Sequence, residues 1–562
     1  MAALSLIYTV WTFWLLLVPL PVQAIWNPII SGWNPDGSIL RVGDDYYIAT
    51  SSFEYWPGIP IYHSKDLSDW KLKSHALTRP EQLQLYGTPT GAGAWAPSLA
   101  FFDGKFWLSA MTRWTYDPVA RVWPRVWFMS SPDLKTWSNP VWAEPWGIDP
   151  ELFHDPLTNT TYLNLMAPNN NKDRLWGLYQ CEVSLKTGDC VARPEGPKMY
   201  YKDDWYYLLT AEGGTDQLHR ASIARSKSPS GPFQANPHNP LMYNGKWGFT
   251  NLTVQSTGHA TLVETAKGEW YASFLARRNI NGSSPLGRET FLVNVDWKDG
   301  WPVLNKGNPI LLSEQVEPKS GPKKTPSRWI DNFSNHKLDP SWYQLRTPYT
   351  KNYELKAGRL VLKPNVFSLS ERDSPAARLR KQKSLNMTWS AELSSFKGNL
   401  GPRNRLGISS YLSEFQHQDI GISGCVNQTG ICIYTELNKN GTQEASRPPL
   451  SRITVSNYLQ YWQKPLKQAK GLSKELKLHI RAEPLRYRLG YSFGSDQPTY
   501  VTSIASKWQA FAPPNWFVFS GASFALFATG GGEPWPGNGP EVGFERVWEN
   551  YHEEDIPDYD RW

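Results

Sequence analysis

Three acidic residues occupy equivalent places in short turn-forming segments of the first half of the chain. They are Asp36 in Asn-Pro-Asp-Gly, Asp149 in Ile-Asp-Pro-Glu and Glu195 in Glu-Gly-Pro. Two carboxyl groups roughly 6.5 to 9.5 Å apart can hydrolyse a glycosidic bond with inversion, because one protonates the leaving oxygen while the other activates a water molecule on the opposite face. A third carboxylate beside the proton donor raises the donor's pKa and keeps it protonated. Three acids that meet therefore suit three roles.

The acidic segments belong to a repeat that occurs five times. Each segment is followed, about ten to thirteen residues later, by an aromatic strand, and the unit recurs about every 44 to 65 residues. A turn motif at 64–70, Ser-Lys-Asp-Leu-Ser-Asp-Trp, returns at 131–137 as Ser-Pro-Asp-Leu-Lys-Thr-Trp and predicts an outer hairpin. The segments and their strands are 34–37 with 46–48, 95–98 with 106–108, 148–151 with 162–163, 195–197 with 205–207, and 257–260 with 270–271.

An inner strand, an aromatic strand and an outer hairpin make one blade of a β-propeller, so we predict five blades over residues 25–313. Inner strands converge on one axis, which would bring the three acids together. Taken singly, Asp36 and Asp149 are more often turn residues, because Asp commonly precedes Gly or Pro in turns. Glu195 is a poor turn former, and the coincidence of three acids at one repeat position favours a site.

Length and composition predict an all-β chain of two domains. A chain of 562 residues is too long to form a single hydrophobic core. Its 29 Trp, 27 Tyr, 42 Gly and 45 Pro favour short strands and turns. Residues 314–328 carry three prolines and no apolar periodicity, which is typical of a linker. Alternating strands at 358–362 and 475–480 then predict a β-sandwich over 329–562.

The N-terminus and the cysteines predict a secreted protein. Residues 1–24 combine an apolar run with the small-residue pattern Val-Gln-Ala, so we expect a signal peptide cleaved after Ala24; the alternative, a signal anchor, would need a longer apolar run. Four cysteines in two close pairs, Cys181 with Cys190 and Cys425 with Cys432, predict two local disulfides and no metal site. Seven glycosylation sequons agree with this compartment: Asn159, Asn251, Asn281, Asn332, Asn386, Asn427 and Asn440.

The charge of the chain is uninformative about partners. The net charge of +7 is small for this length, and basic residues are interspersed with acids outside the linker. A nucleic-acid surface would need clustered basic residues, so we expect no nucleic-acid partner, and no membrane association after signal cleavage. The sequence leaves the oligomeric state open.

Long motifs make residues 25–313 resemble glycoside hydrolase family 43, and the whole chain resembles its two-domain β-xylosidase and α-L-arabinofuranosidase type. The matching stretches are 34–55, Glu-Gly-Pro at 195–197, Ala-Glu-Gly-Gly-Thr at 211–215, Thr-Gly-His-Ala at 257–260 and Leu-Gly-Arg-Glu-Thr-Phe-Leu at 286–292. The resemblance implies a five-bladed propeller followed by a concanavalin A-like (jelly-roll) β-sandwich. It also implies that Asp36 is the general base, Glu195 the general acid, and Asp149 the residue that orients Glu195 and tunes its pKa.

The resemblance further implies a sugar pocket around these acids. Arg288 would donate hydrogen bonds to sugar hydroxyls, Phe53 and Trp95 would form apolar walls, and His259 would lie near the axis beside a carboxylate or a water molecule. We expect no cofactor for the chemistry. The resemblance also implies that a structural calcium ion could bind near the axis, as in parts of the family. His259 would be a poor ligand for it, because calcium prefers oxygen ligands.

Four positions depart from the family pattern: Gly37 after the base, Ser98 in the Trp-Ala-Pro motif, Lys198 after Glu-Gly-Pro, and Leu218 before His219. Lys198 lies three residues after the expected acid and would lower its pKa if the ammonium pointed inward. A glycine- and proline-rich loop at 530–539, which carries Trp535, is a candidate for a pocket wall supplied by the sandwich, with a simple turn as the equal alternative.

These observations predict a secreted, inverting exo-glycosidase that removes terminal β-1,4-linked xylose from xylan fragments. The nearest alternative is an α-L-arabinofuranosidase, alone or in a bifunctional enzyme on arabinoxylan. A non-catalytic carbohydrate-binding protein is a rival of another class, and the intact acid triad argues against it. A retaining fructosidase would require an early Trp-Met-Asn-Asp-Pro-like motif, which the sequence lacks.

Overall fold

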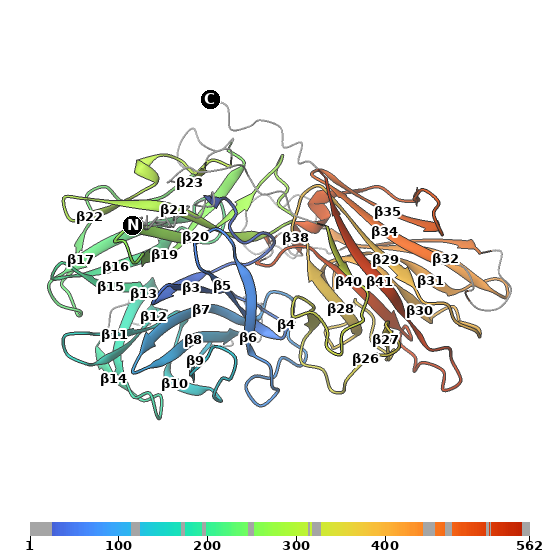
Figure 1. Ribbon diagram of the computed structural model, residues 1–562, viewed down its shortest axis with the longest axis horizontal. Helices are drawn as coiled ribbons and strands as arrows, with labels where there is room; N and C mark the ends of the chain where they lie inside the picture. The colour runs from blue at the N-terminus through green and yellow to red at the C-terminus, as the bar shows by residue number, and fades with distance from the viewer. Residues whose placement is uncertain are drawn as a thin grey trace, which may run out of the picture.

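The computed structural model describes residues 25–113, 124–169, 175–193, 198–245, 252–312, 315–316, 328–441, 456–466, 472, 475–512, 516–517 and 519–552. In these ranges the regular secondary structure consists of β-strands and two short 3-10 turns, so the predicted all-β class is confirmed. No helix long and apolar enough to span a membrane is found among the described residues. The strands form two lobes: the N-terminal one is blue to green in Figure 1 and the C-terminal one yellow to red. The predicted signal peptide, 1–24, lies outside the described residues.

Five antiparallel four-stranded sheets form the N-terminal lobe within the described ranges, and the strands of each follow one another along the chain, apart from β4, which leaves the first sheet. The first holds β2 (Ser38–Val42), β3 (Asp45–Ala49), β5 (Gly58–Ser64) and β6 (Lys71–Leu77); the second β7 (Gly93–Phe102), β8 (Lys105–Arg113), β9 (Arg125–Ser131) and β10 (Val141–Trp146); the third β11 (Ile148–His154), β12 (Thr161–Asn169), β13 (Leu175–Val183) and β14 (Cys190–Arg193); the fourth β15 (Lys198–Lys202), β16 (Trp205–Glu212), β17 (Arg220–Ser226) and β18 (Gln234–Ala235); and the fifth β19 (Val254–Glu264), β20 (Trp270–Arg278), β21 (Arg288–Lys298) and β22 (Trp301–Leu304).

The predicted repeat corresponds to these blades. Each predicted aromatic strand lies in the second strand of its sheet, β3, β8, β12, β16 or β20. The repeated Asp of the turn motif closes the outer hairpins: Asp66 accepts hydrogen bonds from the amides of Ser68 and Asp69, both 2.9 Å, and Asp133 does the same between β9 and β10. A side-chain acceptor at the first turn position satisfies amides that the ladder leaves unpaired, which is why Asp is used there.

The inner strands pack around one axis. β2 contacts β7 and β19, β7 contacts β11, and β11 contacts β15. Apolar clusters fill the spaces between neighbouring blades, for example Trp127 and Leu108 with Ala49 and Ile61 between the first two. The inner faces of the blades are therefore held in fixed relative positions by burial of apolar surface.

Residues 25–27 and 315–316 lie against the propeller. Asn27 exchanges two 2.8 Å hydrogen bonds with the backbone of Leu292 in β21. In the predicted linker, 314–328, only residues 315–316 and 328 are described. The former make a two-residue strand, β23 (Gln315–Val316), on β1 (Ile25–Trp26), so this part of the linker has structure that its composition did not predict. The 3-10 turn η1 (Asn305–Gly307) lies between β22 of the fifth blade and β23.

The C-terminal lobe is a sandwich of two antiparallel sheets in the described ranges. One contains β24 (Trp329–Asp331), β26 (Tyr353–Leu355), β27 (Leu360–Leu362), β29 (Met387–Leu393), β34 (Leu476–Glu483), β35 (Arg486–Phe493), β36 (Thr499–Tyr500), β37 (Ile504–Ala505) and β41 (Val542–Tyr551); the other contains β28 (Ala376–Lys381), β30 (Arg405–Ser413), β31 (Gln416–Gly424), β32 (Ile431–Gly441), β33 (Ser456–Pro465) and β40 (Ser523–Thr529). Side chains of alternate residues, such as Ile408 in β30 and Ile480 in β34, share one buried core. The lobe also contains η2 (Ser506–Gln509), β38 (Phe511–Ala512) and β39 (Trp516–Phe517).

The two lobes share a buried junction. β4 (Tyr55–Trp56) of the propeller pairs with β25 (Gln344–Leu345) of the sandwich, and Trp33 and Phe53 pack in one apolar cluster with sandwich residues. Gly32 approaches the carbonyl oxygen of Gln382 so closely that a Cβ atom there would lie 2.6 Å from it. A glycine is therefore required at this contact, where its φ is +78°.

Both predicted disulfides are present. Cys181 pairs with Cys190 across β13 and β14 with an S–S distance of 1.96 Å, and Cys425 pairs with Cys432 with 2.06 Å. No described cysteine is free.

Candidate active site

Irregular backbone places the candidate residues on the inner strands. Asp36, Ala96, Asp149 and His259 all have positive φ angles, from 44° to 58°. In β7, β11 and β19 the strand register shifts at these positions, which marks a β-bulge. A bulge redirects a side chain away from the regular alternation of a strand. Repetition of this feature on several blades explains why the short segments found in the sequence hold the residues that meet at the axis.

Asp36 is a buried carboxylate with three positive or hydrogen-bonding neighbours. The Ser51 hydroxyl donates a 2.6 Å hydrogen bond to Oδ2, Arg288 Nη1 lies 3.0 Å from Oδ1, and His259 Nδ1 lies 3.8 Å from the same oxygen. Burial acts to raise the pKa of Asp36, but Arg288, His259 and the Ser51 hydrogen bond outweigh it, so the pKa lies below the usual 3.8. The group is therefore an anion that can accept a proton.

Ser51 also fixes the neighbouring blade. Its hydroxyl oxygen accepts a 2.7 Å hydrogen bond from the amide of Ala96, next to Trp95. The same side chain thus joins Asp36 to the Trp-Ala-Pro segment, and Asp36 and the aromatic wall are positioned together.

Arg288 lies between the base and an aromatic wall. Besides Asp36, its Nη1 donates to the Thr215 hydroxyl at 3.3 Å, and its Nε donates to the carbonyl oxygen of Phe519 at 3.2 Å. Its guanidinium carbon is 6.0 Å from the Phe53 ring centre and 5.1 Å from that of Phe519. A rigid, buried guanidinium in this position can orient both the Asp36 carboxylate and a bound hydroxyl group.

Three aromatic rings form the apolar wall, and one of them comes from the sandwich. Phe53 and Trp95 are 6.2 Å apart in an edge-on arrangement, and Phe519 lies 5.2 Å from Trp95 and 6.3 Å from Phe53. The sequence analysis did not predict that Phe519 contributes to this wall. Trp535, the sandwich residue it considered, instead donates to Pro540 and packs against the core of its own domain.

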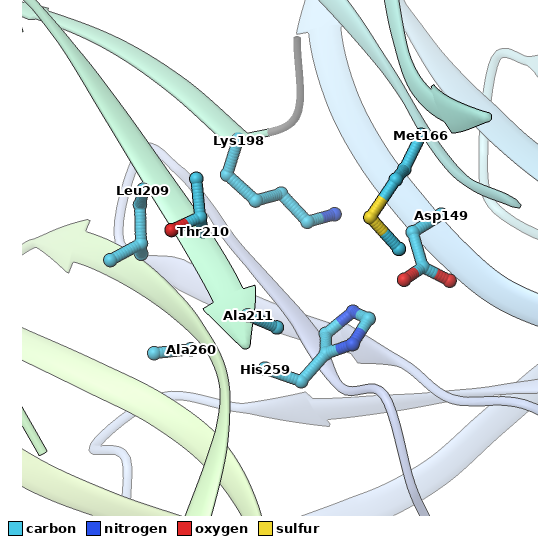
Figure 2. Close-up of a pocket in the computed structure, with 8 residues that line it drawn as sticks. All are labelled: Asp149, Met166, Lys198, Leu209, Thr210, Ala211, His259 and Ala260. Carbon is cyan, nitrogen blue, oxygen red and sulfur yellow. The ribbon is translucent and has the colours of Figure 1, made fainter. Parts of the chain in front are cut away.

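Asp149 lies on β11 and is partly exposed, whereas Asp36 is buried. Asp149 lines a small pocket of about 20 Å³ with Met166, Lys198 and His259, as Figure 2 shows. Burial and the negative charge of Asp36 raise the pKa of Asp149 to about 7, against the opposing effect of Lys198 and Arg288. The pocket is large enough for about one water molecule, and Asp149 at its edge is partly exposed, so its carboxyl group can act on a neighbouring group.

The Lys198 side chain points into the axial pocket, which is the case that the sequence analysis had described. It is the first residue of β15, is only 6% exposed, and extends its ammonium into the axial pocket (Figure 2). Burial lowers its pKa below 10.5, while Glu151, Asp149 and Asp36 favour its charged form.

His259 and His219 are buried near Asp36. Burial lowers the pKa of each to about 4, so both are neutral at neutral pH. His219 bonds through Nδ1 to the Ser256 carbonyl at 3.2 Å, and its ring packs against Gly258, where a Cβ atom would lie 2.6 Å away. Leu218, before it, is 48% exposed and is not among the residues that line the axial pocket.

Glu195 lies outside the described residues, so its assignment as general acid stays a prediction. The structure describes the chain on either side, from Arg193 at the end of β14 and from Lys198 at the start of β15. It also brings together five other predicted site residues, Asp36, Arg288, His259, Phe53 and Trp95.

The axis has a poor donor set for calcium. No group of three or more His, Cys, Asp or Glu side chains that could hold a metal occurs among the described residues. The ammonium of Lys198 and the guanidinium of Arg288 already lie among the carboxylates, and both would repel a dication. We therefore derive no step through a metal ion.

Comparison with known proteins identifies the family. Residues 25–302 match the family model "Glycosyl hydrolases family 43", and 330–537 match "Beta xylosidase C-terminal Concanavalin A-like domain". The chain belongs to glycoside hydrolase family 43, with the five-bladed propeller and the concanavalin A-like domain of that type.

Relatives carry both activities in their names. A non-reducing end α-L-arabinofuranosidase of Bacteroides ovatus is 36% identical over 400 residues, 68% of this chain and 72% of the relative. A β-xylosidase of Bacillus subtilis is 32% identical over 508 residues, 84% of this chain and 90% of the relative. The crystal structure of a xylan β-1,4-xylosidase from Bacillus halodurans superposes with a TM-score of 0.82 at 28% identity, covering 94% of this chain and all of the other.

Proposed function

We propose that the protein is a secreted, inverting exo-glycosidase that releases terminal β-1,4-linked xylose from xylo-oligosaccharides. The observation that carries the proposal is Asp36, a buried carboxylate held as an anion by Arg288 beside an aromatic wall. Membership of a family of xylosidases and arabinofuranosidases gives the reaction class.

In the proposed reaction Asp36 removes a proton from a water molecule as that water attacks the anomeric carbon. The bond from this carbon to the leaving oxygen breaks, and Glu195 transfers its proton to that oxygen. Asp149 orients Glu195 and, as an anion, raises its pKa. Asp36 is suited to its part because an anionic carboxylate is needed before a proton can be accepted.

The aromatic wall supports action on a terminal sugar. Trp95 and Phe519 are partly exposed and present apolar surface that suits the C–H groups of a pyranose ring, while Phe53 is fully buried and supports them from behind. Because Phe519 comes from the second domain, the sandwich covers one side of the site. A site covered in this way favours a chain end over the middle of a polymer.

An α-L-arabinofuranosidase is the second candidate, favoured by the name of the 36% identical relative from Bacteroides ovatus. Both sugars present similar hydroxyl groups to such a pocket, so a bifunctional enzyme on arabinoxylan is part of this candidate. Kinetics on aryl β-D-xyloside and aryl α-L-arabinofuranoside, side by side, separate the two. Cleavage of neither substrate would refute the proposal and favour a carbohydrate-binding protein.

The mechanism has its own test. Proton NMR of the first sugar released from a β-xyloside should show the α-anomer before mutarotation, as inversion requires. A β-anomer as first product would contradict the assignment of Asp36 as a base.

Secretion is proposed from the N-terminal segment, the disulfides and the sequons. Asn159, Asn281 and Asn427 are exposed and open to glycosylation. Expression of the full chain in a eukaryotic secretion host should yield a product in the medium that begins at Ile25 and loses mass on treatment with a peptide N-glycosidase. Retention in the cell with an intact residue 1–24 segment would contradict this.

A further inference from the structure

A buried lysine at the propeller axis has no role in the reaction described above. Lys198 is 6% exposed, and its ammonium reaches into the pocket lined by Asp149, Met166 and His259 (Figure 2). None of the described residues forms a direct ion pair with it. An ammonium group in such a position loses much of its hydration, and that cost needs to be offset by negative charge nearby.

The titratable groups that face Lys198 come from β11, from the segment before β2 and from β19. Asp149 and Glu151 lie on β11, Asp36 precedes β2, and His259 on β19 is neutral. Arg288 on β21 is the other described cation that acts on this set, and it is bound to Asp36. Among the described residues, Lys198 is therefore the cation that offsets the charges of Asp149 and Glu151.

Glu151 fixes the strand from which Lys198 projects. Its Oε2 accepts hydrogen bonds from the amide of Met199 at 2.7 Å and from Asn164 Nδ2 at 3.1 Å, and Gln180 in turn donates to Asn164 at 3.0 Å. β15 is thereby attached to β11 at its first residues, directly after the segment that contains Glu195. The backbone position of Lys198 is set by this attachment.

We propose that Lys198 is a positioning residue that acts through Asp149, keeping this carboxyl group ionised beside the proton donor of the reaction. The inference deepens the proposed function and rests on it. Without Lys198, Asp149 would remain beside Asp36 in a buried site with only Arg288 to offset the two charges.

The predicted effect of Lys198 on the pH profile has a definite sign. A nearby cation lowers the pKa of a carboxyl group, and its removal raises that pKa. The pKa of Asp149 is already raised to about 7 by burial and by Asp36, in spite of Lys198. Loss of the ammonium should therefore move protonation of Asp149, and with it the acid limb of the kcat/KM profile, to higher pH.

The experiment compares pH profiles of kcat/KM on whichever aryl glycoside the wild-type enzyme cleaves. Lys198→Met and Lys198→Gln remove the charge, and Lys198→Arg keeps it. Lys202→Met is the matched control, because Lys202 lies on the same strand but ion-pairs with Asp203 and faces Trp297, away from the pocket. We expect the neutral variants to shift the acid limb upward by about one pH unit or more, and the arginine variant and the control to keep the wild-type limb.

Each outcome decides one question. If the wild-type enzyme cleaves neither substrate, the proposed function fails. If it is active and both neutral variants lose rate equally at all pH values with an unshifted limb, Lys198 has only a structural role and the inference is overturned. If the neutral variants do not fold, folding of Lys198→Arg supports the requirement for charge, and misfolding of all three variants overturns it.

Discussion

The ammonium of Lys381 in the sandwich donates a 2.8 Å hydrogen bond to Oδ1 of Asn34 in the propeller, two residues before Asp36. Oδ1 of Asn34 also accepts a 2.8 Å hydrogen bond from the Tyr62 hydroxyl. The backbone N–H of Asn34 donates a 2.8 Å hydrogen bond to the Arg288 carbonyl oxygen. The segment that carries the base is thus attached to its own blade, to the fifth blade and to the second domain. The sandwich takes part in building the site as well as in covering it.

Replacement of Lys381 tests this attachment. Lys381 is buried over the Trp33 ring at 3.9 Å, so Lys381→Met keeps most of the packing and removes the hydrogen bond. We expect the free energy of unfolding to fall by about 1–3 kcal/mol and kcat to fall more than KM changes, because Asp36 loses a support and substrate contacts remain. Chemical denaturation and steady-state kinetics measure the two effects.

Lys363→Met is the control for Lys381, since Lys363 is an exposed sandwich lysine. Equal kinetics for the Lys381 variant and this control would show that the contact does not position the base.

Asp36→Asn removes the group that accepts a proton from water. A general base contributes typically about 10²–10⁴-fold, so we expect kcat to fall by at least that order while xylose binding, measured by calorimetry, persists. Asn can still accept from Ser51, which limits structural change. Retention of more than about a tenth of the wild-type kcat would assign the base to another residue.

Asp149→Asn should make the protein more stable at alkaline pH. The pKa of Asp149 is raised from 3.8 to about 7 in the folded state, so the folded protein binds a proton there that the unfolded chain has lost. This group's contribution to stability is present below pH 3.8 and is lost as the pH rises through about 7. The variant should therefore gain about 4 kcal/mol over wild type at pH 8 relative to pH 3.5, with much lower kcat.

Thermal unfolding of wild type and Asp149→Asn at several pH values measures this difference. A stability difference between the two proteins that does not change with pH would contradict a raised pKa for Asp149.

Glu151 gives a paired prediction on stability. Glu151→Ala leaves the Met199 amide and Asn164 without their acceptor and removes a counter-charge of Lys198. Loss of one partner in a buried charged network costs about 3–5 kcal/mol. Glu151→Gln keeps an acceptor for the Met199 amide, so we expect a smaller loss; equal losses for the two variants would mean that the hydrogen bonds contribute nothing.

The blades were predictable from sequence because each repeats the same local chemistry. Asp66 and Asp133 cap equivalent turns, and aromatic residues mark equivalent second strands. Asp36 and Asp149 could be found because the repeat places them at matching positions. The signal was the coincidence, since each residue alone resembles a turn residue.

The contribution of the sandwich was less predictable. Phe519 lies between strands with no motif around it, and its place beside Arg288 depends on how two domains dock, which local sequence does not encode. Trp535 looked suitable because it is an aromatic residue in a glycine-rich loop. The same features allow a loop to fold back on its own domain, as it does here. Burial of Glu151 gave no local signal either, because its partners lie on two other strands.

Phe519→Ala tests whether the second domain contributes to binding of the terminal sugar. The ring lies against Trp95 and above the Arg288 guanidinium, so its loss should remove apolar contact with the sugar and let water reach the guanidinium. Removal of an aromatic contact in a binding site costs about 1–3 kcal/mol, which predicts a rise in KM of at least about fivefold for the aryl xyloside. Trp535→Ala, in the same domain but packed on its own core, is the matched control. A rise in KM for Trp535→Ala that equals the rise for Phe519→Ala would attribute the effect to general loosening of the sandwich instead of the wall.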